Sequence, residues 1–381
     1  STTGTNSVFL GFMAGYANTT GSQNIAIGDR AMHAATLTGN NNVGIGAFAL
    51  DGLTSGAQNT AIGAQSLDTN STGHNNVAVG YVALYNNTTA SDNSALGVNA
   101  LYSNTTGTAN TGLGRSALRL NVVGSNNTAV GYDALRNNTA NSNTAIGYES
   151  LLNNTSGSNN TAVGEVALRA NTTTSNNTAV GHASLNANTA NNNTAYGWFS
   201  ARQNTTGTGL TAIGLQALDA NTTGSSNVAV GQETLKANTT ASNNTAVGYS
   251  ALTANTTGIQ NVAVGQALTR TTTAQDNIAL GLLAGRGTTT GSYNIAIGSL
   301  ALGSASATTS EGNVGVGYYA LSVNSGNNNV AIGRQALQAN TTASNNTAVG
   351  YQALLDNTTG ADNNAFGKGS LQSATTGGDN S

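Results

Sequence analysis

The sequence offers few groups that could carry chemistry, and they do not gather at one place. The three histidines, His33, His74 and His182, occupy three different positions of an internal repeat and lie many repeats apart. We therefore expect isolated surface side chains rather than one metal site or one catalytic group. Serine is abundant, but no Ser-His-Asp arrangement can be proposed. Glycine pairs such as Gly44 and Gly46 lack the full fingerprint and the following helix of a phosphate-binding loop.

One pair of carboxylates shares a repeat position. Asp133 and Glu149 should lie on successive coils, about 5 Å apart, where they could raise a pKa or bind a cation. The alternative is a solvated edge near Arg136. The Asp-bearing glycine-rich signature of calcium-binding solenoids is absent. We expect no catalytic residue, no cofactor and no metal, and so no enzyme.

The composition excludes several classes of protein. Charged residues make up 7% of the 381 residues, where a soluble domain has about 25%. The net charge of −3 gives no footprint for nucleic acid or an anionic membrane. Cysteine is absent, which removes disulfides and thiolate metal sites. No apolar run approaches the roughly 18 residues that span a bilayer, so no membrane insertion is expected in this segment.

A repeat of about 17 residues runs along the whole chain. Its anchor is the glycine that closes the pattern Asn-x-Ala-x-Gly or a close variant of it, and there are 22 such anchor glycines. A unit this short suits one coil of a β-solenoid and is too short for a pair of helices. We expect residues 1–381 to form a single continuous array: an all-β, parallel β-solenoid of about 22 coils, roughly 100 Å long. The repeat is in phase at both ends, which suggests a segment of a longer fibre. Representative anchors are Gly80, Gly97, Gly131, Gly164, Gly231 and Gly248.

Alternation before the anchor predicts a short strand with one face in the core. Thr128 and Val130 should point the same way, and Leu135, four residues after the anchor, should join them in the interior. Stacked coils would then form apolar ladders. No coil could bury its face alone, so stability would come from neighbouring coils.

The residue between those two is almost always alanine. It is Ala in 18 of the 22 units and Gly in three. Because a solvated face would tolerate larger polar residues, we expect this face to be covered by identical sheets of neighbouring chains. The alternative is that alanine merely fits a tight coil. The predicted interface includes Ala78, Ala129, Ala162, Ala179 and Ala246.

Aromatic residues recur directly after the anchor. They could stack on sugars or contact a partner, or they could pack between chains at a corner of the coil. The candidates are Tyr81, Tyr132, Tyr148, Trp198 and Tyr249.

A column of threonines stands eight residues after the anchor, as at Thr88, Thr105 and Thr139. A flat threonine ladder resembles an ice-binding solenoid. The alternative is a turn in which stacked Asn and Thr side chains hydrogen-bond along the axis.

Two stretches point to a family. NNVAVG (75–80) and NNVAIG (328–333) resemble the NSVAIG-type repeat of trimeric autotransporter adhesin heads, and the chain also looks like the repeats of bacterial and phage tail-fibre proteins. The resemblance covers essentially the whole chain. It implies a left-handed parallel β-roll, three chains side by side, and attachment at a cell surface or virion. Two departures are a longer Asn-Thr-Thr turn and Thr in place of Val in many strands.

These observations predict a non-enzymatic, extracellular fibre, either an adhesin head or a tail-fibre shaft. Its partners would be itself, as a homotrimer and possibly end to end, and an unknown surface receptor or glycan. Two alternatives are a self-assembling extracellular filament and an ice-binding solenoid that uses the Thr ladder.

Overall fold

The computed structural model describes residues 3–34, 36–304 and 308–380. The chain divides into two units, Ser1–Asn192 and Asn193–Ser381. The described residues form three-residue β-strands joined by turns, with no α-helix among them. None of their elements is a helix that could cross a membrane. The prediction of an all-β parallel solenoid with a repeat of about 17 residues is confirmed.

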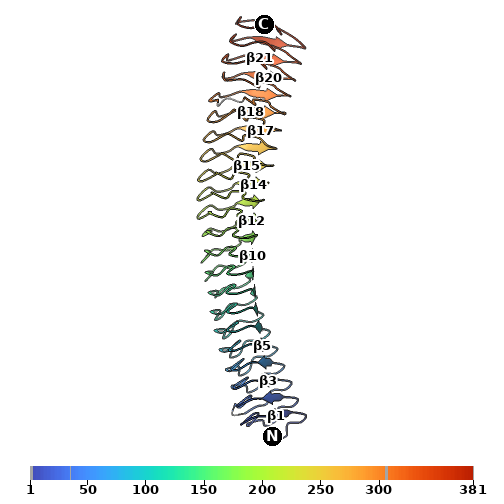
Figure 1. Cartoon of the computed structure of the whole chain (residues 1–381), viewed down its shortest axis with the longest axis vertical. Coiled ribbons are helices and arrows are strands. Elements are labelled where there is room, and N and C mark those ends of the chain that lie inside the picture. The colour runs from blue at the N-terminus through green and yellow to red at the C-terminus, as the bar shows by residue number, and fades with distance from the viewer. Residues whose placement is uncertain (1–2, 35, 305–307, 381) are drawn as a thin grey trace. The chain divides into compact units, whose positions relative to one another are not determined.

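In the first unit, each strand pairs in parallel with the strand of the next coil (Figure 1). Thr161, for example, pairs with Thr144 on one side and with Thr178 on the other. The strands of this unit are β1 (Val8–Leu10), β2 (Ile25–Ile27), β3 (Val43–Ile45), β4 (Thr60–Ile62), β5 (Val77–Val79), β6 (Ser94–Leu96), β7 (Thr111–Leu113), β8 (Thr128–Val130), β9 (Thr144–Ile146), β10 (Thr161–Val163) and β11 (Thr178–Val180).

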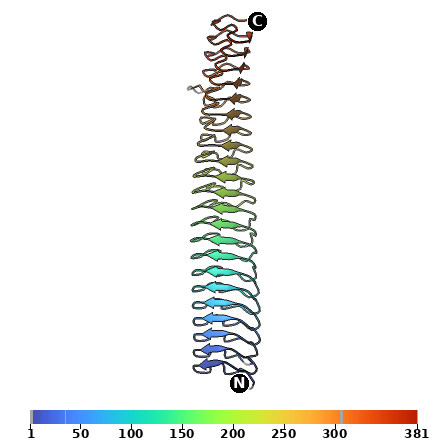
Figure 2. The same cartoon turned by 90° about the vertical axis from the view of Figure 1, so that its right-hand side faces the viewer.

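The second unit repeats the arrangement, and within it the strands again stack on one another (Figure 2). Thr211 pairs with Thr194 and with Val228. The strands of this unit are β12 (Thr194–Tyr196), β13 (Thr211–Ile213), β14 (Val228–Val230), β15 (Thr245–Val247), β16 (Val262–Val264), β17 (Ile278–Leu280), β18 (Ile295–Ile297), β19 (Val314–Val316), β20 (Val330–Ile332), β21 (Thr347–Val349) and β22 (Asn364–Phe366).

The strand faces are the reverse of the prediction. The middle alanine of each strand points into its own coil, and Thr128 and Val130 on either side of Ala129 are only half-buried. Leu135 is fully buried as expected. The predicted alanine interface is therefore wrong, because these side chains are already enclosed within a single chain. Ala78, Ala129, Ala162, Ala179 and Ala246 are all 0% exposed.

The restriction to alanine has a packing cause, since the middle residue of the strand faces the large apolar side chain, usually leucine, of the preceding coil. Where Gly112 replaces alanine, an added Cβ would lie 3.3 Å from Cγ of Leu101. In the first coil the sizes are exchanged: Phe9 occupies the alanine position and Gly15 the leucine position, where a Cβ would lie within 2.4 Å of the Phe9 ring. A narrow coil thus holds one large and one small residue.

Buried asparagines supply the rest of the interior. Asn127, directly before β8, is fully buried, and its backbone N–H and its Nδ2 both donate to Oδ1 of Asn110 in the preceding coil, at 3.0 and 3.1 Å. The same Nδ2 donates to the carbonyl of Ala140 in the following coil, at 2.8 Å. Each amide therefore links three coils, which offsets the cost of burying it.

A second asparagine ladder lies seven residues after the anchor. Nδ2 of Asn87 donates to Oδ1 of Asn70, 2.9 Å away in the preceding coil, and to the carbonyl of Ala90 in its own turn, at 3.0 Å. Asn104 repeats both bonds one coil further on. The return turn predicted around the Asn-Thr-Thr stretch is thus held from the inside by a stack of amides.

The anchor glycines turn the chain at the end of every strand. Gly164 has φ of +130°, and an added Cβ would lie 2.5 Å from the carbonyl oxygen of Gly181 in the next coil. This combination of a positive φ and close backbone contact admits only glycine. Gly80, Gly97, Gly131, Gly231 and Gly248 have φ between +127° and +138°.

Candidate binding surfaces of the coil

The outer face of the sheet carries large apolar side chains in both units. The first and third residues of each strand project outward beside the buried alanine. Ile62 and Ile146 are each 40% exposed, and Leu96 is 48% exposed. These residues form two columns of Thr, Val, Ile and Leu, which we call the sheet face. A contiguous apolar surface of this kind is typical of an interaction site.

The sheet face is hollowed around β5–β7. The hollow has a volume of about 290 Å³ and is lined by Val77, Val79, Leu96 and Leu113, with Ser94 and Thr111 beside them. Ser94 lies in register between Val77 of β5 and Thr111 of β7, and its small side chain lines the hollow. The hollow contains almost no polar surface, so it suits an apolar side chain rather than a polar ligand.

Three of the five predicted aromatic residues stack on another ring, either in the same column or on the next residue of the chain. Tyr132 stacks on Tyr148 with ring centroids 5.6 Å apart, and the guanidinium of Arg115 lies 5.7 Å from the Tyr132 ring. The neighbouring Glu149 carboxylate raises the pKa of Tyr148. In the second unit, Trp198 stacks on Phe199 at 4.3 Å.

Among the predicted aromatic candidates, only Tyr132 and Tyr148 are brought into contact. Tyr81 and Tyr249 stand on separate coils and are both exposed. Tyr81 contributes instead to a different groove. In the second unit, the position directly after the anchor alternates between rings and a cation. The guanidinium of Arg334 lies 5.7 Å from the ring centroid of Tyr318 and 5.9 Å from that of Tyr351.

The groove that Tyr81 helps to line was not predicted from the sequence. It runs across the coils of residues 63–119 and has a volume of about 310 Å³. Tyr85 and Tyr102 stand in it on successive coils and stack with ring centroids 5.3 Å apart and planes 6° from parallel. The signal available in the sequence was their equal spacing, five residues after Gly80 and Gly97. We call this feature the tyrosine groove; it is lined by Gln65, Tyr81, Tyr85, Asn99, Tyr102 and Arg119, with Val82 beside them.

Two carboxylates continue the column of Tyr85 and Tyr102 on the preceding coils. Burial raises the pKa of Asp68 to about 6, and the negative charge of Asp51 adds to the shift. Burial also raises the pKa of Asp51, against the opposing charge of His33. The Asp68 carboxylate in turn raises the pKa of Tyr85. These two aspartates are the electrostatically coupled acidic pair of the first unit, which the sequence analysis sought at Asp133 and Glu149.

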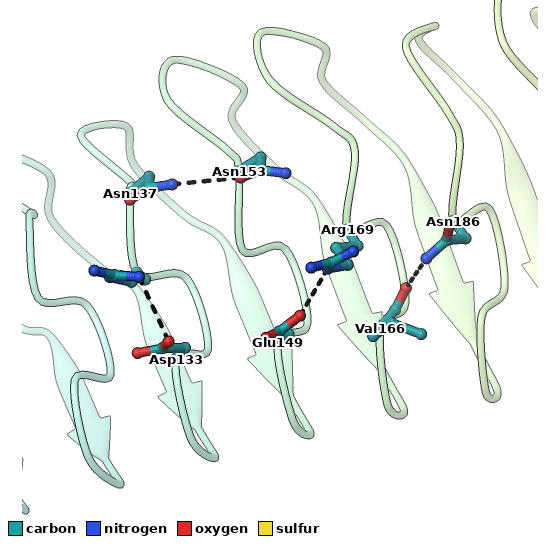
Figure 3. A network of polar contacts seen from close by, with 8 residues as sticks. Asp133, Asn137, Glu149, Asn153, Val166, Arg169 and Asn186 are labelled. Carbon is teal, nitrogen blue, oxygen red and sulfur yellow. Dashed lines mark hydrogen bonds and ion pairs between the residues drawn. The ribbon is translucent and has the colours of Figure 1, made fainter.

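Asp133 and Glu149 are paired with arginines rather than with each other (Figure 3). The carboxylate of Asp133 lies 3.6 Å from Arg136, and that of Glu149 lies 2.7 Å from Nε of Arg169 in the next coil. Asp133 is paired with Arg136, as the second alternative expected, but neither carboxylate is solvated, because the side chains of Asp133 and Glu149 are only 11% and 15% exposed. Asn137 and Asn153 lie beside these pairs and meet at 3.5 Å.

The three histidines lie apart in the structure. His33 lies 3.6 Å from Asp51, and His182 lies 3.6 Å from Glu165. Nδ1 of His74 accepts a hydrogen bond from the backbone of Ala57. Within the described residues, no group of three His, Cys, Asp or Glu side chains could hold a metal ion.

The threonines of the return turn use their hydroxyls along the axis. Oγ1 of Thr88 donates to the carbonyl of Thr105, and Oγ1 of Thr105 donates to that of Val122, at 3.2 and 3.0 Å. Thr139 and Thr155 repeat the bond. The geometry is that of a turn stabilised by axial hydrogen bonds.

Comparison with known proteins adds no relative to these observations: no protein-family model matches the chain, and no curated protein sequence matches it.

Proposed function

We propose that the chain is a non-enzymatic structural fibre that mediates attachment at a cell surface or virion. The observation that carries the proposal is the exposed apolar sheet face, which continues from coil to coil within each unit. An enzyme or a small-molecule receptor would concentrate its polar groups at one site. This repeat instead presents the same surface many times, which favours assembly and multivalent contact.

The proposal places the sheet faces of three identical chains against one another. The alanines cannot serve this purpose, but the outward Val, Ile, Leu and Thr columns can. Burial of such columns is favourable in proportion to the apolar area removed from water. The resemblance to adhesin heads implies three chains side by side, each with left-handed coils. Residues 1–381 of each chain would then act as one array.

A self-assembling filament would use the same surfaces differently. The test is sedimentation and negative-stain electron microscopy at rising protein concentration. A constant mass and a constant particle length support the fibre of fixed size. Particles that lengthen with concentration would favour the filament.

Ice binding has one observation in its favour, because five consecutive strands of the first unit, β7–β11, present threonine on the outer sheet face at Thr111, Thr128, Thr144, Thr161 and Thr178. The return-turn ladder is a weaker candidate, since its hydroxyl protons are used in axial hydrogen bonds. Measurable thermal hysteresis would support ice binding, and its loss in Thr144→Lys would locate the site on the sheet face.

A further inference from the structure

We propose that the tyrosine groove binds an acidic sugar, that is, a pyranose unit bearing a carboxylate. The inference rests on the proposed attachment function and names the class of ligand that one surface of the fibre would hold. It is argued from the residues of coils 63–119, all of which lie in the first unit.

The groove differs from the equivalent surface of neighbouring coils in its charges. In two other coils, the residues two and five after the anchor neutralise one another, as Asp133 does with Arg136 and Glu233 with Lys236. In the tyrosine groove the residues two after the anchor are uncharged, including Gln65 and Asn99. The acidic partners of the motif are therefore missing at this place.

Arg119 is left without such a partner. Within the described chain, no carboxylate lies within ion-pair distance of its guanidinium, whereas Arg136 in the next coil has Asp133 3.6 Å away. Asp133, the nearest acid two residues after an anchor, is paired with Arg136. A guanidinium is suited to binding a carboxylate through two parallel hydrogen bonds. Arg119 therefore defines the anionic end of the ligand.

The remaining residues match a sugar ring. Tyr81, Tyr85 and Tyr102 provide rigid aromatic surface with hydroxyl groups, and the amides of Gln65 and Asn99 can both donate and accept hydrogen bonds. Sugars present apolar C–H faces and hydroxyl edges, which these two kinds of residue contact. A groove of about 310 Å³ is of the size that holds a small ligand.

The groove is also polarised along the axis. Asp68 lies beyond Tyr85 at one end, and Arg119 lies beyond Tyr102 at the other. They are three coils apart, roughly 14 Å at about 4.8 Å per coil, which is long enough for a short oligosaccharide. The ligand carboxylate would lie at Arg119 and its hydroxyls toward Gln65, because Asp68 repels an anion when ionised.

The second unit offers a contrasting groove. It has a volume of about 480 Å³ and is lined by Val323, Gln335, Gln338, Leu355 and Asp356, with Ala339. It contains no aromatic ring and no cation, so it is not expected to bind the same ligand. The tyrosine groove is thus a local specialisation of a surface that recurs in the repeat.

The test is titration of the intact chain with trigalacturonate and with sialyllactose, followed by ligand-observed NMR and calorimetry. We expect saturable binding of at least one of them, weakened about tenfold or more in Arg119→Gln, which removes a charge-assisted pair. Arg136→Gln is the matched control, since this arginine lies in the same column but outside the groove, and it should leave binding unchanged. Melting curves would establish that both variants remain folded.

Three results would overturn the proposal: no binding of either acid up to about 10 mM, far above a typical Kd for such contacts; equal losses in the two arginine variants; or equally strong binding of the methyl ester of trigalacturonate. Failure here is distinguishable from failure of the proposed fibre. A native mass of one chain would contradict the trimer and leave a positive sugar titration standing.

Discussion

Oδ1 of Asn255 is buried and has no hydrogen-bond partner within the described chain, because Thr271 occupies the position where the next coil should present an asparagine. One coil earlier the ladder is intact: Nδ2 of Asn255 donates to Oδ1 of Asn238 at 3.0 Å. Oδ1 of Asn357 is orphaned in the same way, and the position in the following coil is Ala374. The ladder therefore has a direction: the Oδ1 of each asparagine accepts a hydrogen bond from the Nδ2 of the asparagine in the following coil.

Thr271→Asn should stabilise the second unit. The new Nδ2 would donate to the orphaned oxygen of Asn255, as the other ladder asparagines do. The buried bond from Oγ1 of Thr271 to the carbonyl of Thr288 would be lost, so the expected net gain is no more than about 1 kcal/mol. The measurement is the urea midpoint at fixed protein concentration. Thr273→Asn is the control, because Thr273 is exposed and lies outside the ladder. A midpoint no higher than that of the control would contradict the ladder's contribution.

Gly164→Ala should disrupt the fold locally. The Cβ would lie 2.5 Å from the carbonyl of Gly181, and φ of +130° is unfavourable for any residue with a side chain. We expect a loss of several kcal/mol, on the order of 3 or more. Gly209→Asn is the matched control, because Gly209 has φ of +66° and its Cβ would meet nothing closer than 3.7 Å. Similar melting of the two variants would argue against the anchor's role.

Ala162→Val should destabilise the coil itself. Ala162 is fully buried, and two extra methyl groups would overpack the narrow interior at a cost of about 1–3 kcal/mol. Thr161→Val, on the adjacent outward position, should change stability by less than about 0.5 kcal/mol. Equilibrium unfolding in urea compares the two. Were the larger loss to occur at Thr161, the assignment of the strand faces would be incorrect.

Stability should depend on the protonation of Asp68. Its pKa of about 6 in the folded state lies above the ordinary value of 3.8, so the folded state binds the proton more tightly than the unfolded state. Its contribution is fully present below pH 4 and is lost as the pH rises through 6. Asp68→Asn should therefore raise the melting temperature at pH 7 but not at pH 4. A melting temperature of Asp68→Asn that differs from the wild type equally at pH 4 and pH 7, or at neither, would refute the assignment.

The period of the repeat and the parallel strands could be predicted from the sequence, because glycine spacing and turn residues determine where each coil begins and ends. The choice of face could not. Alternation places Thr128 and Val130 on one side and Ala129 on the other, but it does not say which side is inside. The large apolar residues at the first and third positions of many strands suggested a core. The coil is too narrow to enclose them beside a leucine such as Leu135, so they point outward.

Axial hydrogen bonding of stacked asparagines was one of the alternatives drawn from the sequence, but their burial was not predicted. Asn127 and Asn87 looked like turn residues, since asparagine is common in turns. Their complete burial depends on stacking against the same residue one coil away, which the propensity of a single residue does not reveal. The tyrosine groove was missed because Tyr85 and Tyr102 gain their significance from Arg119 and Gln65 on other coils.

The central claim is that the sheet face is covered by identical chains. Light scattering after gel filtration measures it most directly, on the wild type and on two variants, Ile146→Lys on the sheet face and Ser156→Lys on the exposed turn. We predict a mass near three times 37.7 kDa for the wild type and for Ser156→Lys, and a smaller mass for Ile146→Lys, because a buried unpaired lysine opposes association. A wild-type mass of one chain, or an Ile146→Lys assembly as large as the wild type, would contradict the account.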